Sequence, residues 1–178
     1  MKTIMKSEEI ERTLLRMAHQ ILEGLGGLER VGLVGIQSGG AILARRLAYI
    51  FKKIEKKEVP VGVLDIAFYR DDVTRRPEPP KVKRTDIPFD VEDKRIVLVD
   101  DVLFTGRSIR AAMDALMDMG RPERIALAVL VDRGGRELPI CPDFVGKTFE
   151  VSPEERIEVM IKEKPSRTDK VVVVRQDR

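Results

Sequence analysis

The strongest constraint on the fold is a set of short apolar runs in which hydrophobic residues do not alternate with polar ones. Residues 31–36 read VGLVGI and residues 95–99 read RIVLV, and similar runs occupy residues 61–67 and 125–131. Alternating strands expose one face to water, whereas continuous apolar strands of this length are buried on both faces, as in parallel sheets. The pattern predicts an α/β fold with a mainly parallel sheet.

Amphipathic helices are predicted between these strands. Residues 7–23, about 41–53 and 108–119 place apolar side chains three and four positions apart. Ser7 is the expected N-terminal cap of the first helix. Strand–helix–strand units of this kind form right-handed crossovers, which place helices on the faces of the sheet. The length of the chain fits a single domain, residues 1–178.

Two regions depart from this regular order. Residues 68–93 combine prolines with many charges and show no steady period, and so long a connection is typical of a lid, a binding loop or an irregular hairpin. We expect this segment to form an excursion from the core. Towards the C-terminus, residues 147–151, 157–161 and 171–174 are predicted as further strands.

Composition excludes several classes of protein. The single cysteine, Cys141, excludes an intrachain disulfide and a cysteine-cluster zinc site. No run approaches the roughly 20 apolar residues that span a bilayer, and the first residues turn acidic before a secretory apolar region forms. We therefore expect a cytoplasmic protein that does not associate with membranes. A net charge of +3 is too small to indicate nucleic-acid binding by itself.

Residues 97–109, VLVDDVLFTGRSI, carry the clearest chemical signal. A buried strand leads to two adjacent carboxylates, Asp100 and Asp101, and a Thr-Gly-Arg-Ser turn then opens a helix. Unpaired backbone N–H groups at the helix start, with the hydroxyls of Thr105 and Ser108, form a cradle for a phosphate. Carboxylates accept hydrogen bonds from vicinal sugar hydroxyls and are ligands for Mg²⁺. The stretch predicts a site for a ribose 5-phosphate.

The same stretch resembles the signature of type I phosphoribosyltransferases, which bind 5-phosphoribosyl-1-diphosphate (PRPP). Residues 64–73, 113–139 and 143–147 further resemble the family of pyrimidine-operon attenuators with uracil phosphoribosyltransferase activity. The likeness covers nearly the whole chain. It implies the type I phosphoribosyltransferase fold, with a mainly parallel sheet flanked by helices, a flexible flap at about 68–93, and a small hood from N-terminal residues and about 134–150. It also implies a homodimer or homotetramer.

The resemblance assigns roles to individual residues. The catalytic residues would be Arg70, Asp100 and Asp101. Asp100 and Asp101 would also bind the metal. The phosphate of the nucleotide would be bound by Phe104, Thr105, Gly106, Arg107 and Ser108. The diphosphate would be bound by Gln37, Ser38, Gly39 and Gly40. The flap would begin with Tyr69, Arg70, Asp71 and Asp72, and the base would face Val131, Asp132 and Arg133.

The reaction implied by the resemblance joins uracil to PRPP in the presence of Mg²⁺ and releases UMP and diphosphate. Phe104 favours uracil over hypoxanthine as the base. Purine phosphoribosyltransferases with a similar motif carry a carboxylate at this position to hydrogen-bond the purine, and an aromatic ring cannot accept that bond.

Members of this family also bind the leader messenger RNA of pyrimidine operons when UMP is plentiful. Four residues match positions of the basic face that they use: Arg16, His19, Arg136 and Lys147. The match is incomplete, because Gly135 and Cys141 replace basic or hydrogen-bonding residues. Three functions stay open from the sequence. These are a bifunctional RNA-binding regulator and uracil phosphoribosyltransferase, a uracil phosphoribosyltransferase without an RNA role, and a phosphoribosyltransferase for another base.

Overall fold

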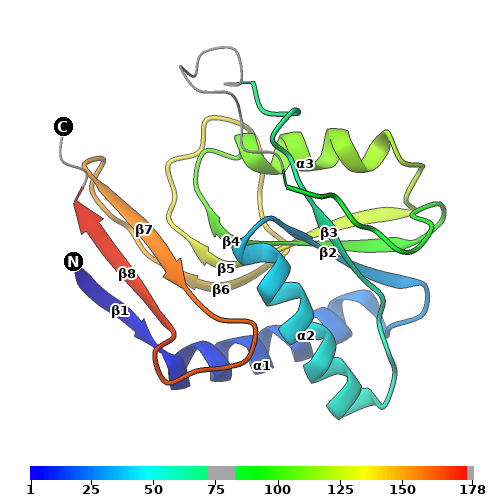
Figure 1. The fold of residues 1–178 in the computed structure, drawn as a ribbon, viewed down its shortest axis with the longest axis horizontal. Coiled ribbons are helices and arrows are strands. Elements are labelled where there is room, and N and C mark those ends of the chain that lie inside the picture. Colours follow the sequence, from blue (N-terminus) through cyan, green and yellow to red (C-terminus); the bar gives the residue numbers. More distant parts are fainter. Residues whose placement is uncertain (72–82, 176–178) are drawn as a thin grey trace.

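The computed structural model describes residues 1–71 and 83–175, which form two sheets and three helices (Figure 1). The larger sheet has five strands in the order β3-β2-β4-β5-β6, and every neighbouring pair is parallel. These strands are β2 (Val31–Ile36), β3 (Val61–Leu64), β4 (Arg95–Leu103), β5 (Arg124–Asp132) and β6 (Phe144–Thr148). The expected α/β class with a parallel sheet is confirmed.

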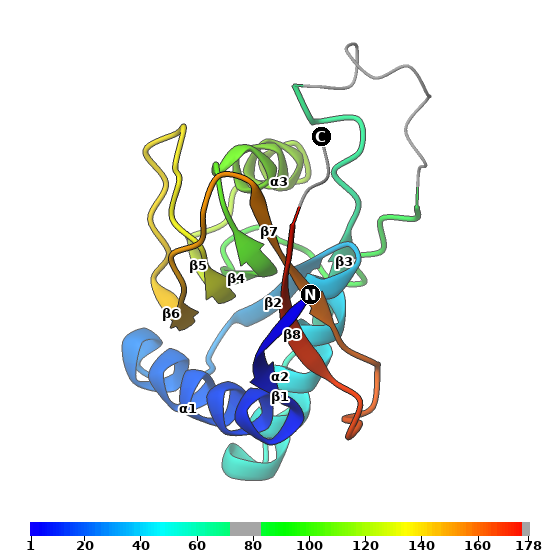
Figure 2. The ribbon, with the colours of Figure 1, turned by 90° about the vertical axis from the view of Figure 1, so that its left-hand side faces the viewer.

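Helices cover both faces of this sheet. α1 (Ser7–Leu25) and α2 (Gly39–Glu55) lie on one face, and α3 (Arg107–Met117) lies on the other (Figure 2). Each face has its own apolar core. Adjacent residues of one strand, such as Val97 and Leu98, belong to opposite cores. This double burial explains why the central strands read as continuous apolar runs.

The ends of α1 differ from those expected. Gly26 ends the helix in the left-handed region, at φ 65°, where its N–H bonds to the Glu23 carbonyl at 3.1 Å. Ser7, expected to cap the start, is the first helical residue; Lys6 holds the cap position, and no side chain caps the helix there. The prediction of a Ser7 cap was wrong.

Other bounds shift because of close backbone packing or pairing. α2 begins at Gly39, so the two glycines of the QSGG segment form its first turn rather than a loop ahead of it. A side chain at Gly40 would overlap the Val99 carbonyl of β4, and this contact lets the helix begin directly against the sheet. β3 ends at Leu64, earlier than expected, and β6 begins at Phe144, earlier than the predicted strand.

A smaller antiparallel sheet lies beside the larger one (Figure 1). It has the order β1-β8-β7, from β1 (Lys2–Lys6), β7 (Glu155–Met160) and β8 (Lys170–Arg175). The hood was expected from N-terminal residues and about 134–150. The N-terminal strand lies in the small sheet, and β6, within the second of these ranges, pairs with β5 in the larger sheet. The partners of β1 come instead from the C-terminal strands.

The expected flap is described in part. Asp72 lies outside the described residues, together with residues 73–82. The segment that follows runs back along β3, where Asp86 and Val63 exchange two backbone hydrogen bonds of 2.8 Å. Among the helices of the described segments, none is long and apolar enough to cross a membrane.

Candidate active site

Two adjacent carboxylates lie near the carboxyl end of β4, at the centre of the larger sheet. Asp100 is 8% exposed, and one of its oxygens accepts the N–H of Asp101 at 2.9 Å. An Asp101 oxygen accepts the N–H of Val102 at 2.8 Å. β4 continues to Leu103, so both acids lie within the strand rather than after its end.

Both carboxyl groups are held where a negative charge is costly. Burial, followed by the charge of neighbouring Asp101, raises the pKa of Asp100 well above its ordinary value. Burial also raises the pKa of Asp101. A cation bound beside these groups would offset the cost of ionising them. The arrangement therefore suits a cationic ligand or a metal ion held with substrate oxygens.

The first turn of α2 lies directly against these acids. A side chain at Gly39 would overlap the Asp101 carboxylate. The peptide bond between Gln37 and Ser38 is cis. The N–H of Gln37 donates to the Leu64 carbonyl at 3.0 Å. The QSGG segment is thus joined to β3 on one side and adjoins the carboxylates on the other.

The predicted phosphate cradle lies at the start of α3. Gly106, at φ 90°, precedes the first residue of α3, and the hydroxyl of Thr105 accepts the N–H of Arg107 at 3.3 Å. Residues 104–108 line a cavity of about 340 Å³, and Asp100 lines it as well. The structure therefore brings the cradle and one of the two acids to a single cavity.

The base of the flap closes one side of this cavity. Arg70 and Asp71 line it, and Arg107 forms ion pairs with Asp71 and, at 2.6 Å, with Glu137. Tyr69 is not among the lining residues. Its hydroxyl donates to Asp118 at 2.7 Å, so it fastens the flap to the end of α3.

The predicted base-facing residues lie at the end of β5 and directly after it, and Arg133 contacts Phe104, which lines the cavity. Val131 is fully buried, and none of Val131, Asp132 and Arg133 lines the cavity itself. The Arg133 guanidinium lies 3.8 Å from the centre of the Phe104 ring. Both carboxylate oxygens of Asp132 accept hydrogen bonds from the turn that follows it. One accepts the Gly134 N–H at 2.9 Å, and the other accepts the Arg136 guanidinium at 2.6 Å. The Asp132 carboxylate therefore orders the turn.

Comparison with known proteins agrees with this geometry. The profile of the phosphoribosyl transferase domain family matches residues 1–161. The bifunctional protein PyrR of Chloroflexus aurantiacus is 53% identical over 174 residues, which cover 98% of this chain and 95% of the relative. That of Thermus aquaticus is 56% identical over 160 residues, which cover 90% and 88%. The chain belongs to the PyrR family of phosphoribosyltransferases. The predicted family is confirmed.

Solved structures show the same fold at low sequence identity. The hypoxanthine phosphoribosyltransferase of Trypanosoma cruzi has a TM-score of 0.70 at 17% identity and covers 99% of this chain and 98% of its own. A hypoxanthine-guanine phosphoribosyltransferase of Bacillus anthracis has a TM-score of 0.66 at 18% identity and covers 88% and 85%. The type I phosphoribosyltransferase fold expected for the PyrR family is confirmed.

The residues predicted to bind RNA occupy different environments. Arg16 donates to the Gly146 carbonyl, and Lys147 pairs with Glu9, so both lie where α1 meets β6. His19 is exposed on α1. Arg136 is set apart from this group, because its guanidinium bonds to Asp132, to the Ile140 carbonyl and to the Phe104 carbonyl that follows β4.

Two residues of the site were not predicted. Glu137 lines the cavity and pairs with Arg107, although the two are 30 positions apart in the chain. Lys83, from the returning part of the flap, donates to the Ser38 hydroxyl beside the diphosphate segment. No local motif marks either residue, since each contact joins segments that only the fold brings together.

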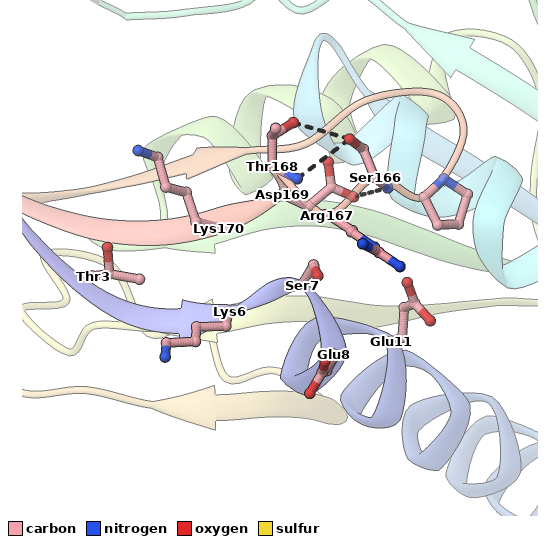
Figure 3. A pocket seen from close by; sticks show the side chains of 11 residues that line it. Thr3, Lys6, Ser7, Glu8, Glu11, Ser166, Arg167, Thr168, Asp169 and Lys170 are labelled. Atoms are coloured by element: carbon pink, nitrogen blue, oxygen red, sulfur yellow. Dashed lines mark hydrogen bonds between the residues drawn. The ribbon is translucent and has the colours of Figure 1, made fainter.

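A second cavity, of about 910 Å³, lies between β1, the start of α1 and the loop before β8 (Figure 3). Charged side chains of both signs line it, among them Lys6, Glu8, Glu11 and Arg167. None of the predicted site residues is among its lining residues. The residues of the predicted phosphate cradle line the smaller cavity only.

Proposed function

We propose that this PyrR family member is a uracil phosphoribosyltransferase that forms UMP and diphosphate from uracil and PRPP, and that with UMP bound it also binds pyrimidine-operon leader RNA and attenuates transcription. One observation carries the enzymatic half. Asp100, the phosphate cradle 104–108 and the flap residue Arg70 line one cavity, and Gly39 adjoins the second acid. These are the groups that a sugar with a phosphate at one end and a diphosphate at the other requires.

The chain's own groups have distinct tasks in this reaction. Backbone N–H groups at the starts of α3 and α2 bind the 5-phosphate and the diphosphate respectively, aided by the Thr105 and Ser108 hydroxyls. Asp100 and Asp101 accept hydrogen bonds from the ribose hydroxyls and stabilise positive charge that develops at the anomeric carbon. The uracil nitrogen bonds to that carbon as the carbon–oxygen bond to the diphosphate breaks, and the proton of that nitrogen passes to the departing diphosphate or to water. Flap closure excludes water, which would otherwise hydrolyse the sugar.

The donor set fits Mg²⁺. Asp100 and Asp101 supply carboxylate oxygens, and Mg²⁺ is usually held by one or two carboxylates together with substrate phosphates and water. Within residues 1–71 and 83–175 no cluster of three or more metal-ligating side chains occurs, so the remaining ligands would come from PRPP and water. When bound, the ion neutralises charge on the leaving diphosphate.

The regulatory half rests on the family and on the basic residues Arg16 and His19 of α1 and Lys147 of β6. The relatives described above are named bifunctional, which favours the two-function reading over an enzyme without an RNA role. Operon leader RNA is bound as it is transcribed, so this function implies a cytoplasmic protein. Assembly into dimers or tetramers stays a prediction.

Gly39→Ala is expected to raise the KM for PRPP by about tenfold or more, because the added methyl would overlap the Asp101 carboxylate and displace the diphosphate segment. Steady-state kinetics with PRPP varied at saturating uracil measure this. The thermal transition of the variant is compared with that of the wild type to confirm that it folds. A folded variant with the wild-type KM for PRPP would remove Gly39 from the diphosphate site.

Arg16→Gln and Lys147→Gln are each expected to weaken binding of a pyrimidine-operon leader RNA in the presence of UMP. Each change removes a cation from the α1–β6 surface, so the slope of log affinity against log salt should fall by about 1 for each lost phosphate contact. Lys52→Gln is the matched control, since Lys52 is an exposed lysine of α2 paired with Glu58. Slopes equal to that of the control would exclude this surface as the RNA site.

The two halves of the proposal are tested together by following UMP formation and RNA binding with one protein preparation. We expect UMP from uracil, PRPP and Mg²⁺, and RNA binding that tightens when UMP is added. UMP formation with no RNA binding at any UMP concentration would favour the enzyme without a regulatory role. RNA binding without turnover would favour a sensor that retains the pocket.

A further inference from the structure

Arg136 follows the predicted base turn, and all three of its side-chain nitrogens are engaged within the chain. Nε donates to the Ile140 carbonyl at 2.9 Å, Nη1 donates to the Phe104 carbonyl at 2.9 Å, and Nη2 donates to Asp132 at 2.6 Å. The side chain is 23% exposed. A guanidinium engaged in three directions is a rigid connector rather than a free surface cation.

These bonds extend the pairing of β4 with β5 beyond the ends of both strands. We call this extension, between residues 103–105 and residues 133–138, the seam. β4 ends at Leu103 and β5 ends at Asp132, but pairing goes on beyond them. The Leu103 carbonyl accepts the Arg133 N–H at 3.0 Å, and the Thr105 carbonyl accepts the Glu137 N–H at 3.0 Å. The Phe104 carbonyl lies between these two acceptors in the chain, and the Arg136 side chain supplies its donor.

The Phe104 side chain is fixed by the same turn. The Arg133 guanidinium lies 3.8 Å from the centre of the ring, and a side chain at Gly135 would come within 2.6 Å of a ring carbon. Gly135 also has φ 74°, a backbone conformation that favours glycine. The turn and the Phe104 ring therefore fit together in only one relative position. A shift of the turn would displace the ring.

The seam matters because Phe104 and Thr105 line the candidate active-site cavity, whereas the turn carries the predicted base-facing residues. Glu137, within the turn, also pairs with Arg107 of the phosphate cradle. The distance between the phosphate cradle and the base turn is thus set by bonds of residues 133–138. A nucleotide must reach both parts at once, so its affinity depends on this distance.

We propose that Arg136 is a positioning residue of the nucleotide pocket, which holds the base turn in register with the 5-phosphate cradle. The inference rests on the proposed function, since it concerns the same site. It gives Arg136 a role that requires no contact with RNA. Loss of RNA binding on replacing Arg136 would then follow from a weakened UMP pocket.

The test compares Arg136→Met and Arg136→Lys with Arg124→Met, without RNA. Arg124 is a matched control, because it also forms an Arg–Asp ion pair, with Asp143, and lies at the opposite end of β5. Arg136→Met should raise the KM for uracil and the Kd for UMP by about tenfold or more, and Arg136→Lys should restore part of the loss. Arg124→Met should change both by less than about twofold. A loss of folded protein alone would lower the apparent kcat and leave KM unchanged.

Amide hydrogen exchange gives a readout that does not depend on activity. The amides of Arg133, Glu137 and Leu138 donate across the seam, so they should exchange faster in Arg136→Met than in the wild type. The inference would be overturned if Arg136→Met kept the wild-type KM for uracil, Kd for UMP and amide protection. If that variant lost only RNA binding, Arg136 would be a direct RNA contact. If the wild type neither makes nor binds UMP, the proposed function fails. Exchange then still decides whether Arg136 orders the turn.

Discussion

Replacing Asp101 by Asn should lower kcat at least about a hundredfold while the protein stays folded. Asparagine keeps the shape of the side chain, and its carbonyl oxygen still accepts the Val102 N–H that Asp101 accepts at 2.8 Å. What it removes is the negative charge that, in the proposed mechanism, stabilises the anomeric carbon and would help to hold Mg²⁺. Burial raises the pKa of Asp101, which means that the charged form of this side chain is unfavourable in the folded protein. A neutral side chain at this position should therefore not lower the stability of the fold.

The control for Asp101→Asn is Asp114→Asn, which makes the same chemical change in an exposed residue of α3. Asp114 pairs with Arg110 one turn away at 3.2 Å, and such surface pairs contribute little. Initial rates at saturating uracil and PRPP, together with thermal transitions, separate the two variants. A kcat of Asp101→Asn within about threefold of the control would remove Asp101 from the catalytic site.

Replacing Asp169 by Ala should reduce the free energy of unfolding by about 3–5 kcal/mol, because it leaves the Arg46 cation buried without its counter-ion. Arg46 of α2 donates to Asp169 at 2.7 Å, and their side chains are 5% and 2% exposed. Asp169 also accepts the N–H groups of Lys162 at 3.2 Å and Ser166 at 3.1 Å, the second of which is visible in Figure 3. The pair thus fastens the small sheet to α2.

The matched control for Asp169→Ala is Glu163→Ala. Glu163 pairs with Arg45, also of α2, at 2.6 Å, but the side chains of Glu163 and Arg45 are 61% and 45% exposed. Exposed pairs contribute less than about 1 kcal/mol. For a chain of this size, thermal unfolding should show a loss of about 6–20 °C for Asp169→Ala and a few degrees at most for Glu163→Ala. Equal losses would show that burial does not strengthen the Arg46–Asp169 pair.

The sequence was sufficient to predict the larger sheet and the order of strand, acids, turn and helix at residues 95–117. Residues 31–36 and 95–99 are buried on both faces, so their apolar pattern reports the sheet directly. The acids and the Thr-Gly-Arg-Ser turn are local in the chain, and local order fixes their geometry. The structure therefore places the cradle 104–108 at the start of α3, as expected.

The small sheet and the ion pairs and hydrogen bonds around the site could not be predicted, because they join residues that are far apart in the sequence. β1 is short and pairs with β8 near the other end of the chain. The ion pair between Arg107 and Glu137 joins the first residue of α3 to the turn after β5, and neither residue marks it in the sequence. Arg136 shows the same limit: a basic residue in a family position suggests RNA contact, whereas its side chain bonds to Asp132, Ile140 and the distant Phe104 carbonyl.

The central claim is tested most directly by a competition assay with equal concentrations of uracil, hypoxanthine and orotate, PRPP and Mg²⁺. The nucleotide products are separated and measured, with Asp101→Asn in parallel. We predict UMP as the only nucleotide formed by the wild type and a loss of nearly all product in Asp101→Asn. A purine nucleotide or orotidine monophosphate as the main product, or no product from any base, would contradict the account.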